Sequence, residues 1–204
     1  TTISLHTPLE IRKNISISAQ VNSEGQNLVT IRPSNRFNPG PDPESTSLIQ
    51  VFAESATANV TISNLIVNGT SQDSETVVRA IEVIENSIET STVPLLKIES
   101  STIQNSGAGS DGGAVLTPGD ITVSHSTFTN NSADEYGGAI YAGGEIRVEK
   151  STFTSNTAGD AGGAIATHSG ETITVTNSAF QSNVATGISG DFYAGGGAIK
   201  GGDG

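Results

Sequence analysis

A unit of 25 residues is repeated in the second half of the chain, between Ile121 and Ile199. Each copy contains an Ile-x-Val pair, then Ser-x-Phe-x-x-Asn, then Gly-Gly-Ala-Ile. Repetition at a fixed period of this length is typical of a solenoid, in which each unit stacks on its neighbours. The repeated positions are Phe128, Asn131, Gly137 and Gly138 in the first copy, Phe153, Asn156, Gly162 and Gly163 in the second, and Phe180, Asn183, Gly196 and Gly197 in the third.

The unit has the spacing of short β-strands separated by tight corners. Three apolar stretches of three to five residues alternate with Gly or Asn, and at about 3.3 Å per residue they make one triangular coil. The next coil would lie in parallel about 4.8 Å away, with identical positions paired. The sequence therefore predicts an all-β parallel β-helix of about 25-residue coils. About eight such coils would fit the chain length.

The repeated residue types suggest distinct structural roles. The Phe residues are expected to form an internal column, and deleting one would cost about 3–5 kcal/mol. The Gly-Gly pair allows a corner at positive φ or a close backbone approach. The Asn residues could bond to their neighbours above and below as a ladder, each bond netting about 1 kcal/mol, or could reflect turn propensity alone.

The regular repeat does not extend over the whole chain. A weaker copy occupies 96–115, where Ile103 replaces the Phe and Ser106 replaces the Asn. Before it, apolar residues alternate with polar ones as in strands, interrupted by loops. We predict a single β-helix over 1–204, with irregular coils over 1–95 and regular repeats over 96–204. The chain stops just after a Gly-Gly-Ala-Ile element, without an initiator Met or signal peptide, so we expect it to be a segment of a longer protein.

Composition narrows the function classes. The net charge is −12 and only nine residues are Lys or Arg, which disfavours nucleic acid or an anionic membrane as partner. Cysteine is absent, so disulfides and thiolate metal sites are excluded. Twenty-four Gly and 4% aromatic residues suit closely stacked coils better than a conventional globular core. No apolar run is long enough to span a bilayer.

Phe-x-x-Asn followed by Gly-Gly-Ala-Ile resembles the repeat of the chlamydial polymorphic outer-membrane proteins. The resemblance covers Leu96–Ile199, and is only loose over 1–95. It implies a right-handed parallel β-helix, export as an autotransporter passenger, a place on the bacterial outer-membrane surface, and adhesion to host cells or surfaces. The departures at Ile103 and Ser106 fall in the first repeat. The C-terminal membrane barrel of the family is not in this sequence, so the anchor is implied by the resemblance alone.

An enzyme is the less favoured alternative, because β-helices also cleave acidic polysaccharides. Such a site needs clustered carboxylates with a basic residue or Ca²⁺ nearby. Neither Lys nor Arg recurs beside the candidate acids, and we expect no catalytic residue, metal site or cofactor. We expect the acids to form a solvated column along one edge, with weak Ca²⁺ binding at Asp134 and Asp160 left open. The candidates, each shortly before a Gly-Gly corner, are Asp111, Asp134, Glu135, Asp160 and Asp191.

Binding residues are expected where loops interrupt the repeat, since loops on a rigid scaffold carry function. One is the proline-rich stretch Arg32–Glu44, which includes Pro33 and offers Arg36 and Phe37. The other is Thr186–Gly195, with Phe192 and Tyr193. We predict a non-enzymatic adhesin segment whose partner is a host-cell or surface receptor, either protein or glycan. The alternative is a filament subunit that associates end to end through exposed strand edges.

Overall fold

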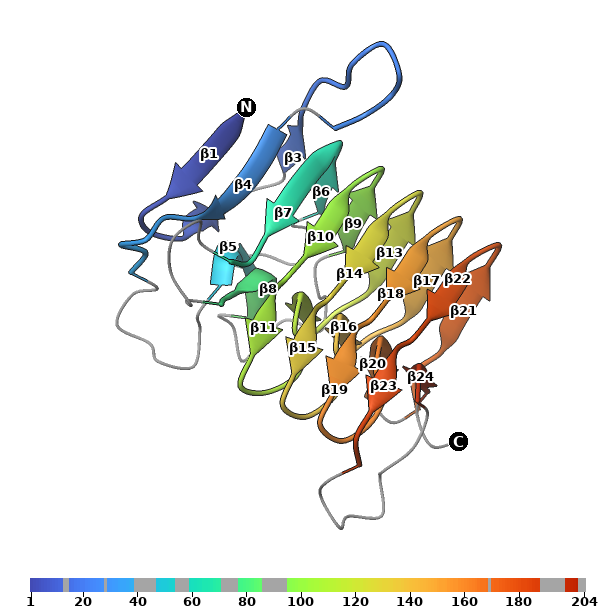
Figure 1. Ribbon diagram of the computed structural model, residues 1–204. Helices are drawn as coiled ribbons and strands as arrows, with labels where there is room; N and C mark the ends of the chain where they lie inside the picture. Colours follow the sequence, from blue (N-terminus) through green and yellow to red (C-terminus); the bar gives the residue numbers. More distant parts are fainter. Residues whose placement is uncertain are drawn as a thin grey trace.

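The computed structural model describes residues 1–12, 15–27, 29–38, 47–53, 59–70, 77–85, 95–168, 170–187 and 197–201. Its regular elements are strands, which wind into stacked coils and form four parallel sheets (Figure 1). The predicted parallel β-helix is confirmed. Within the described ranges, no helix offers a long enough apolar stretch to cross a lipid bilayer.

The sheets run along the axis of the helix, and each takes one strand from successive coils. Sheet 1 contains β1 (Thr2–Leu5), β4 (Val29–Pro33), β7 (Leu65–Asn68), β10 (Thr102–Gln104), β14 (Thr127–Thr129), β18 (Thr152–Thr154) and β22 (Ala179–Gln181). Sheet 2 contains β2 (Leu9–Ile11), β5 (Ser47–Ala53), β8 (Arg79–Glu85), β12 (Val115–Thr117), β16 (Ile140–Ala142), β20 (Ile165–Thr167) and β24 (Ile199–Lys200).

Two further sheets complete the coils. Sheet 3 contains β3 (Ile15–Ser18), β6 (Val60–Ser63), β9 (Leu96–Glu99), β13 (Ile121–Ser124), β17 (Ile146–Glu149) and β21 (Ile173–Thr176). Sheet 4 consists of the two-residue strands β11 (Gly107–Ala108), β15 (Ser132–Ala133), β19 (Thr157–Ala158) and β23 (Val184–Ala185). A regular coil therefore has four strands, one more than the sequence suggested, because the stretch after each Asn also pairs with its neighbours.

The register shows seven coils among the described residues instead of about eight. Along sheet 1, Thr102 pairs with Thr127 and Thr127 with Thr152, which are steps of 25 residues. The earlier steps are longer: 28 residues from Thr2 to Thr30, and 36 from Thr30 to Ile66 and again from Ile66 to Thr102. The longer early coils account for the difference in number.

The Phe residues form the predicted internal column. Phe128 and Phe153 are 0% exposed. Their ring centroids lie 4.8 Å apart with the planes within 5°, and Phe153 stacks on Phe180 at 4.8 Å and 2°. This separation equals the spacing of parallel strands, so the column follows directly from the 25-residue register. Ile103 and Val67 continue it into the earlier coils.

The predicted Asn ladder is confirmed at the corner after sheet 1. The backbone N and Nδ2 of Asn131 both donate to Oδ1 of Asn156, at 3.1 and 2.9 Å. Asn156 makes the same two bonds to Asn183, at 3.0 and 2.9 Å. Ser106 takes the Asn position one coil earlier, and its backbone N donates to Oδ1 of Asn131. The ladder therefore satisfies backbone donors that a corner would otherwise leave unpaired.

A second ladder, which the sequence analysis did not predict, lies at the corner after sheet 3. Its members are Ser101, Ser126, Ser151 and Ser178. Each of the first three donates its backbone N to the Oγ of the next, at 3.0–3.1 Å. At both corners the residue before the ladder position has positive φ, which turns the chain. These residues are Ser100, Asn105, His125, Asn130, Lys150, Ser155, Asn177 and Ser182.

The two glycines of the Gly-Gly element have different roles. Both predicted requirements for glycine, a positive φ and a close backbone approach, are confirmed. The first has positive φ, 64° at both Gly137 and Gly162. The second approaches the next coil closely: a Cβ on Gly138 would lie 2.2 Å from the carbonyl oxygen of Gly163, well inside van der Waals contact. Gly163 is placed in the same way against Gly197. Gly196 lies outside the described residues.

The proline-rich stretch differs from the prediction at its start. We expected a projecting loop from Arg32, but Arg32 and Pro33 are the last residues of β4, where Pro33 pairs with Leu5. Proline is tolerated there because the pairing of β4 with β7 has already ended at Ile31. Residues 39–46 lie outside the described part of the chain.

Candidate functional site

The outer surface of sheet 2 contains an open groove of about 640 Å³. Residues from four successive coils line it, including Glu82 of β8, Leu116 of β12, Tyr141 of β16 and His168 after β20. Glu82 pairs in register with Leu116, and Leu116 with Tyr141, so these side chains lie in one row across the coils. Pro118 adds a further apolar side chain beside this row.

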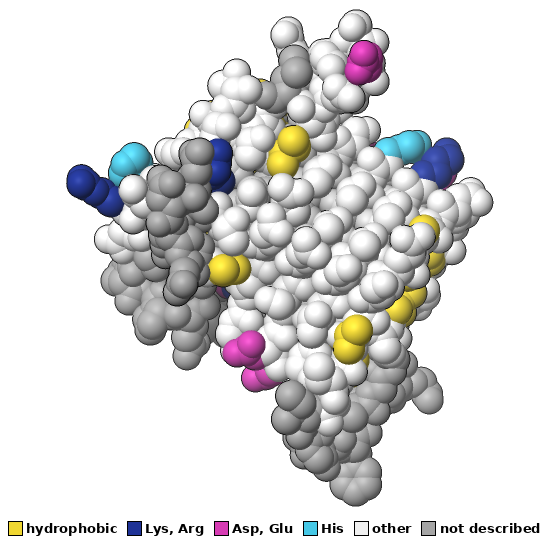
Figure 2. Space-filling view, in the orientation of Figure 1, with side chains coloured by type: hydrophobic (Ala, Val, Ile, Leu, Met, Phe, Trp, Pro, Cys, Tyr) yellow, Lys and Arg dark blue, Asp and Glu magenta, His cyan; other side chains and the backbone are white. Residues whose placement is uncertain are grey.

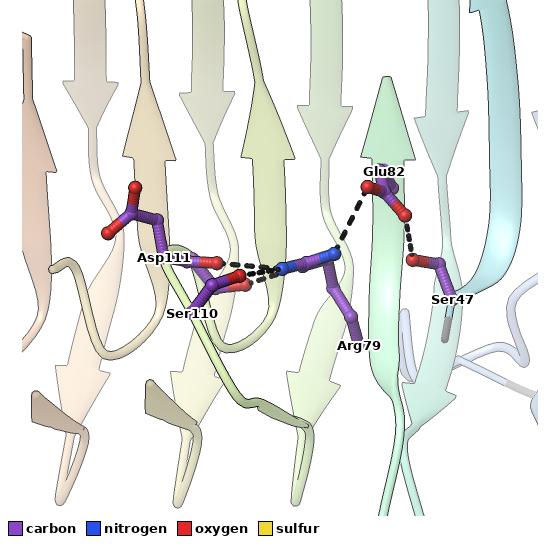
Figure 3. A network of polar contacts seen from close by, with 6 residues as sticks. Ser47, Arg79, Glu82, Ser110 and Asp111 are labelled. Carbon is purple, nitrogen blue, oxygen red and sulfur yellow. Dashed lines mark hydrogen bonds and ion pairs between the residues drawn. The ribbon is translucent and has the colours of Figure 1, made fainter. Parts of the chain in front are cut away.

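Glu82 is held at the groove by a buried polar network (Figure 3). Arg79, 1% exposed, pairs its Nη1 with Oε1 of Glu82 at 3.2 Å. On its other side Arg79 donates to backbone oxygens of the next coil, from Nε to Gly112 at 3.0 Å and from Nη2 to Asp111 at 2.9 Å. Ser47 donates to Oε2 of Glu82. Burial lowers the pKa of Arg79, while the charges of Glu82 and Asp111 oppose that shift.

Asp111 lies at the adjacent corner, with its carboxyl group pointing away from Arg79 (Figure 3). Burial raises the pKa of Asp111 from its usual 3.8 to about 6. The backbone N–H of Tyr136, which donates to Oδ1 at 3.0 Å, opposes the rise, and the nearby charges of Glu135 and Asp160 add to it. Burial also raises the pKa of Tyr141, with a further contribution from the charge of Asp111.

The predicted acidic column is confirmed only in part: Glu135 and Asp160 stack in register, whereas Asp111 and Asp134 are offset from them. The Gly-Gly corners set the register, and the acids lie at different distances before them. Asp160 and Glu135 share a register position two residues before the corner, and Tyr136 bonds to Asp111 from the next coil. Asp134 lies three residues before its corner, where its backbone N–H donates to the carbonyl oxygen of Ala108, so it shares no register position with Asp160. Asp191 lies outside the described residues.

Among the residues that the structure describes, no group of three or more His, Asp or Glu side chains is placed to hold a metal ion. The expectation of weak Ca²⁺ binding at Asp134 and Asp160 required stacking of these two side chains. Asp134 and Asp160 occupy different register positions and do not stack directly, and weak Ca²⁺ binding there stays a prediction.

Of the four predicted binding residues, the structure describes Arg36 and Phe37. Arg36 is exposed, whereas Phe37 is half-buried and packs against the end of the core. A tight turn places them: the backbone N of Phe37 donates to the carbonyl of Ser34, and that of Arg36 to Ser34 Oγ. Phe192 and Tyr193 lie outside the described residues. Arg36 is therefore the accessible member of the described pair.

Sequence reasoning missed the groove and its supporting network. A signal was present in the early coil, where Val78-Arg79-Ala80-Ile81 takes the place of Gly112-Gly113-Ala114-Val115. Arginine at the position of a closely packed Gly indicates a local change of structure. The face formed by sheet 1 shows mostly uncharged polar groups, with charged side chains towards its edges (Figure 2). The groove therefore differs from that face in having an aromatic and ionisable lining.

Comparison with known proteins agrees with the architecture. The family model described as "Right handed beta helix region" matches residues 47–196, more than half of the chain. The protein is thus a right-handed parallel β-helix. The chain belongs to the right-handed β-helix family. No curated protein and no solved structure matches it in the same comparisons.

Proposed function

We propose that this chain is a non-enzymatic passenger segment exposed on the bacterial outer-membrane surface, where it acts as a rigid stalk that presents attachment sites. The supporting observation is that the elements repeated from unit to unit serve to stack the coils. The Phe column, the Asn and Ser ladders and the Gly corners all join one coil to the next. This arrangement leaves loops and outward side chains to vary without loss of the scaffold. The proposed partner is a receptor on a host cell or another surface, either protein or glycan.

Adhesion of beads coated with the purified chain to cultured host cells tests this function. We expect Arg36→Ala, and separately the double change Phe192→Ala and Tyr193→Ala, to reduce bead retention at least severalfold. Circular dichroism should stay unchanged. The matched control is Arg147→Ala, since Arg147 is also an exposed cation but lies on β17 within the regular repeat. If beads coated with the wild-type chain were retained no better than uncoated beads, the proposed function would be contradicted.

Self-association end to end is a second candidate. Apolar side chains are exposed on the first and last described coils, with Ile3 45% and Ile15 46% exposed at one end and Val184 47% at the other. Light scattering over a concentration series and negative-stain microscopy would reveal fibres. Ile15→Lys should abolish them, because it places a charge in the stacking surface. Monomeric rods at high concentration would exclude this candidate.

Polysaccharide cleavage is the least favoured function. In assays of polygalacturonate and neutral glycans with and without Ca²⁺, we expect no release of unsaturated or reducing ends. Turnover that depends on Ca²⁺ would overturn both the non-enzymatic assignment and the expectation that no cofactor is needed.

A further inference from the structure

We propose that the groove on sheet 2 is a binding site for a neutral glycan of linked pyranose rings, with Tyr141 as its stacking platform. This inference rests on the proposed attachment function and names the chemical class of its partner. The observations that support it are the form of the groove, the side chains that line it and the charge balance of its margin.

The groove recognises its ligand through side chains. The backbone N–H and C=O groups of β12 and β16 are directed along the sheet, where these strands pair with each other, with β8 and with β20. An extended peptide therefore finds no open sheet edge to extend on this face. A ligand must instead contact the row of outward side chains, which makes surface shape and side-chain chemistry decisive.

The lining suits a sugar ring. Leu116 and Tyr141 are neighbours in register, about 4.8 Å apart between strands, and form an apolar floor with Pro118. The C–H face of a pyranose packs on such a floor, and Tyr combines an apolar ring with a polar tip. At one end of the groove the exposed His168 offers an imidazole that can hydrogen-bond to a ring hydroxyl group, whereas Glu82 at the other end is buried and already paired with Arg79 and Ser47. The four lining coils span about 14 Å, enough for a short linear oligosaccharide.

The charge balance favours a neutral ligand. The ion pair of Glu82 with buried Arg79 cancels the carboxylate charge at the margin. The chain as a whole carries a net charge of −12, and Asp111 at the adjacent corner has Glu135 and Asp160 as charged neighbours. A polyuronate or sulfated glycan would therefore be repelled. The phenolic O–H of Tyr141 can donate a hydrogen bond to a hydroxyl group of a neutral sugar.

Isothermal titration calorimetry with three hexasaccharides tests the proposal. Chitohexaose and maltohexaose are the neutral probes, and hexagalacturonate is the anionic one. We expect at least one neutral probe to bind and the anionic probe not to bind. Tyr141→Ala should weaken binding about tenfold, whereas Tyr141→Phe should stay within about threefold of wild type because the ring is retained.

Tyr136→Ala is the matched control. Tyr136 lies next to Tyr141, with ring centroids 6.4 Å apart, but does not line the groove, so its removal should leave the affinity within about twofold. The chain contains three Tyr and no Trp, so a ligand-induced change in tyrosine fluorescence that persists in Tyr136→Ala and vanishes in Tyr141→Ala would locate the site directly.

The outcomes separate this inference from the proposed function. Failure of both neutral probes to bind, or equal loss of binding in the two Tyr→Ala variants, overturns the glycan site. If coated beads still adhere to cells in that case, and Tyr141→Ala does not reduce adhesion, the attachment function stands without the groove. If a neutral probe binds through Tyr141 but beads do not adhere, the groove stands and the cell-attachment function fails.

Discussion

The Phe column offers the sharpest test of how the coils hold together. Phe153 is fully buried, with Phe128 stacked on one side and Phe180 on the other at the same 4.8 Å separation. Phe153→Ala removes a buried ring and leaves a cavity inside the stack, at a cost of about 3–5 kcal/mol. Phe180→Ala removes a ring that is partly exposed and has one described stacking partner, so we expect about half that loss.

Urea denaturation followed by circular dichroism measures this difference. Both variants should keep the wild-type spectrum, and the transition midpoint should fall about twice as far for Phe153→Ala as for Phe180→Ala. In a solenoid each coil contacts only its neighbours, so the cost depends on how many neighbours a side chain has. An equal or larger loss for Phe180→Ala would refute the reasoning that stacking on both faces determines the contribution.

Three further predictions concern the corner and the buried network. Gly138→Ala should destabilise the fold by at least about 2 kcal/mol, because its Cβ would meet the carbonyl oxygen of Gly163 in the next coil. Gly197→Ala should cost less than about 1 kcal/mol in the same urea denaturation, because its Cβ would have nothing within 4 Å. Burial raises the pKa of Asp111 from 3.8 to about 6 in the folded chain, so the free energy of unfolding is highest below pH 4, where the carboxyl group is protonated in both states, and falls as the pH rises through 6. Asp111→Asn should remove this fall, which is on the order of 1 kcal/mol for a partly exposed group, in urea melts at pH 4 and 7. Arg79→Met should cost about 3–5 kcal/mol by removing the cation that pairs with the carboxylate of Glu82. Adding Glu82→Leu should restore most of the thermal stability, and an equally unstable double variant would contradict this account.

The regular half of the fold was predictable because its information is local and repeated. A 25-residue period places identical residues one strand spacing apart, which was enough to predict the Phe column, the Asn131–Asn156 contact and the two reasons for glycine at the corners. The Ser residues of the second ladder also recur in the repeat. Their spacing alone did not predict the ladder, because Ser side chains make many other local hydrogen bonds to the backbone.

The candidate site was not predictable in the same way, because it is formed where the repeat changes. Arg79 takes the place of a corner glycine and reaches the backbone of Gly112 in the next coil. The groove combines Glu82 from an irregular coil with Tyr141 from a regular one. Two of the early coils are 36 residues long instead of 25, so sequence spacing no longer indicates which residues are neighbours. The coil period could be read from the chain because one short spacing recurs, whereas the groove and its ion pair depend on contacts between coils whose register becomes known only after folding.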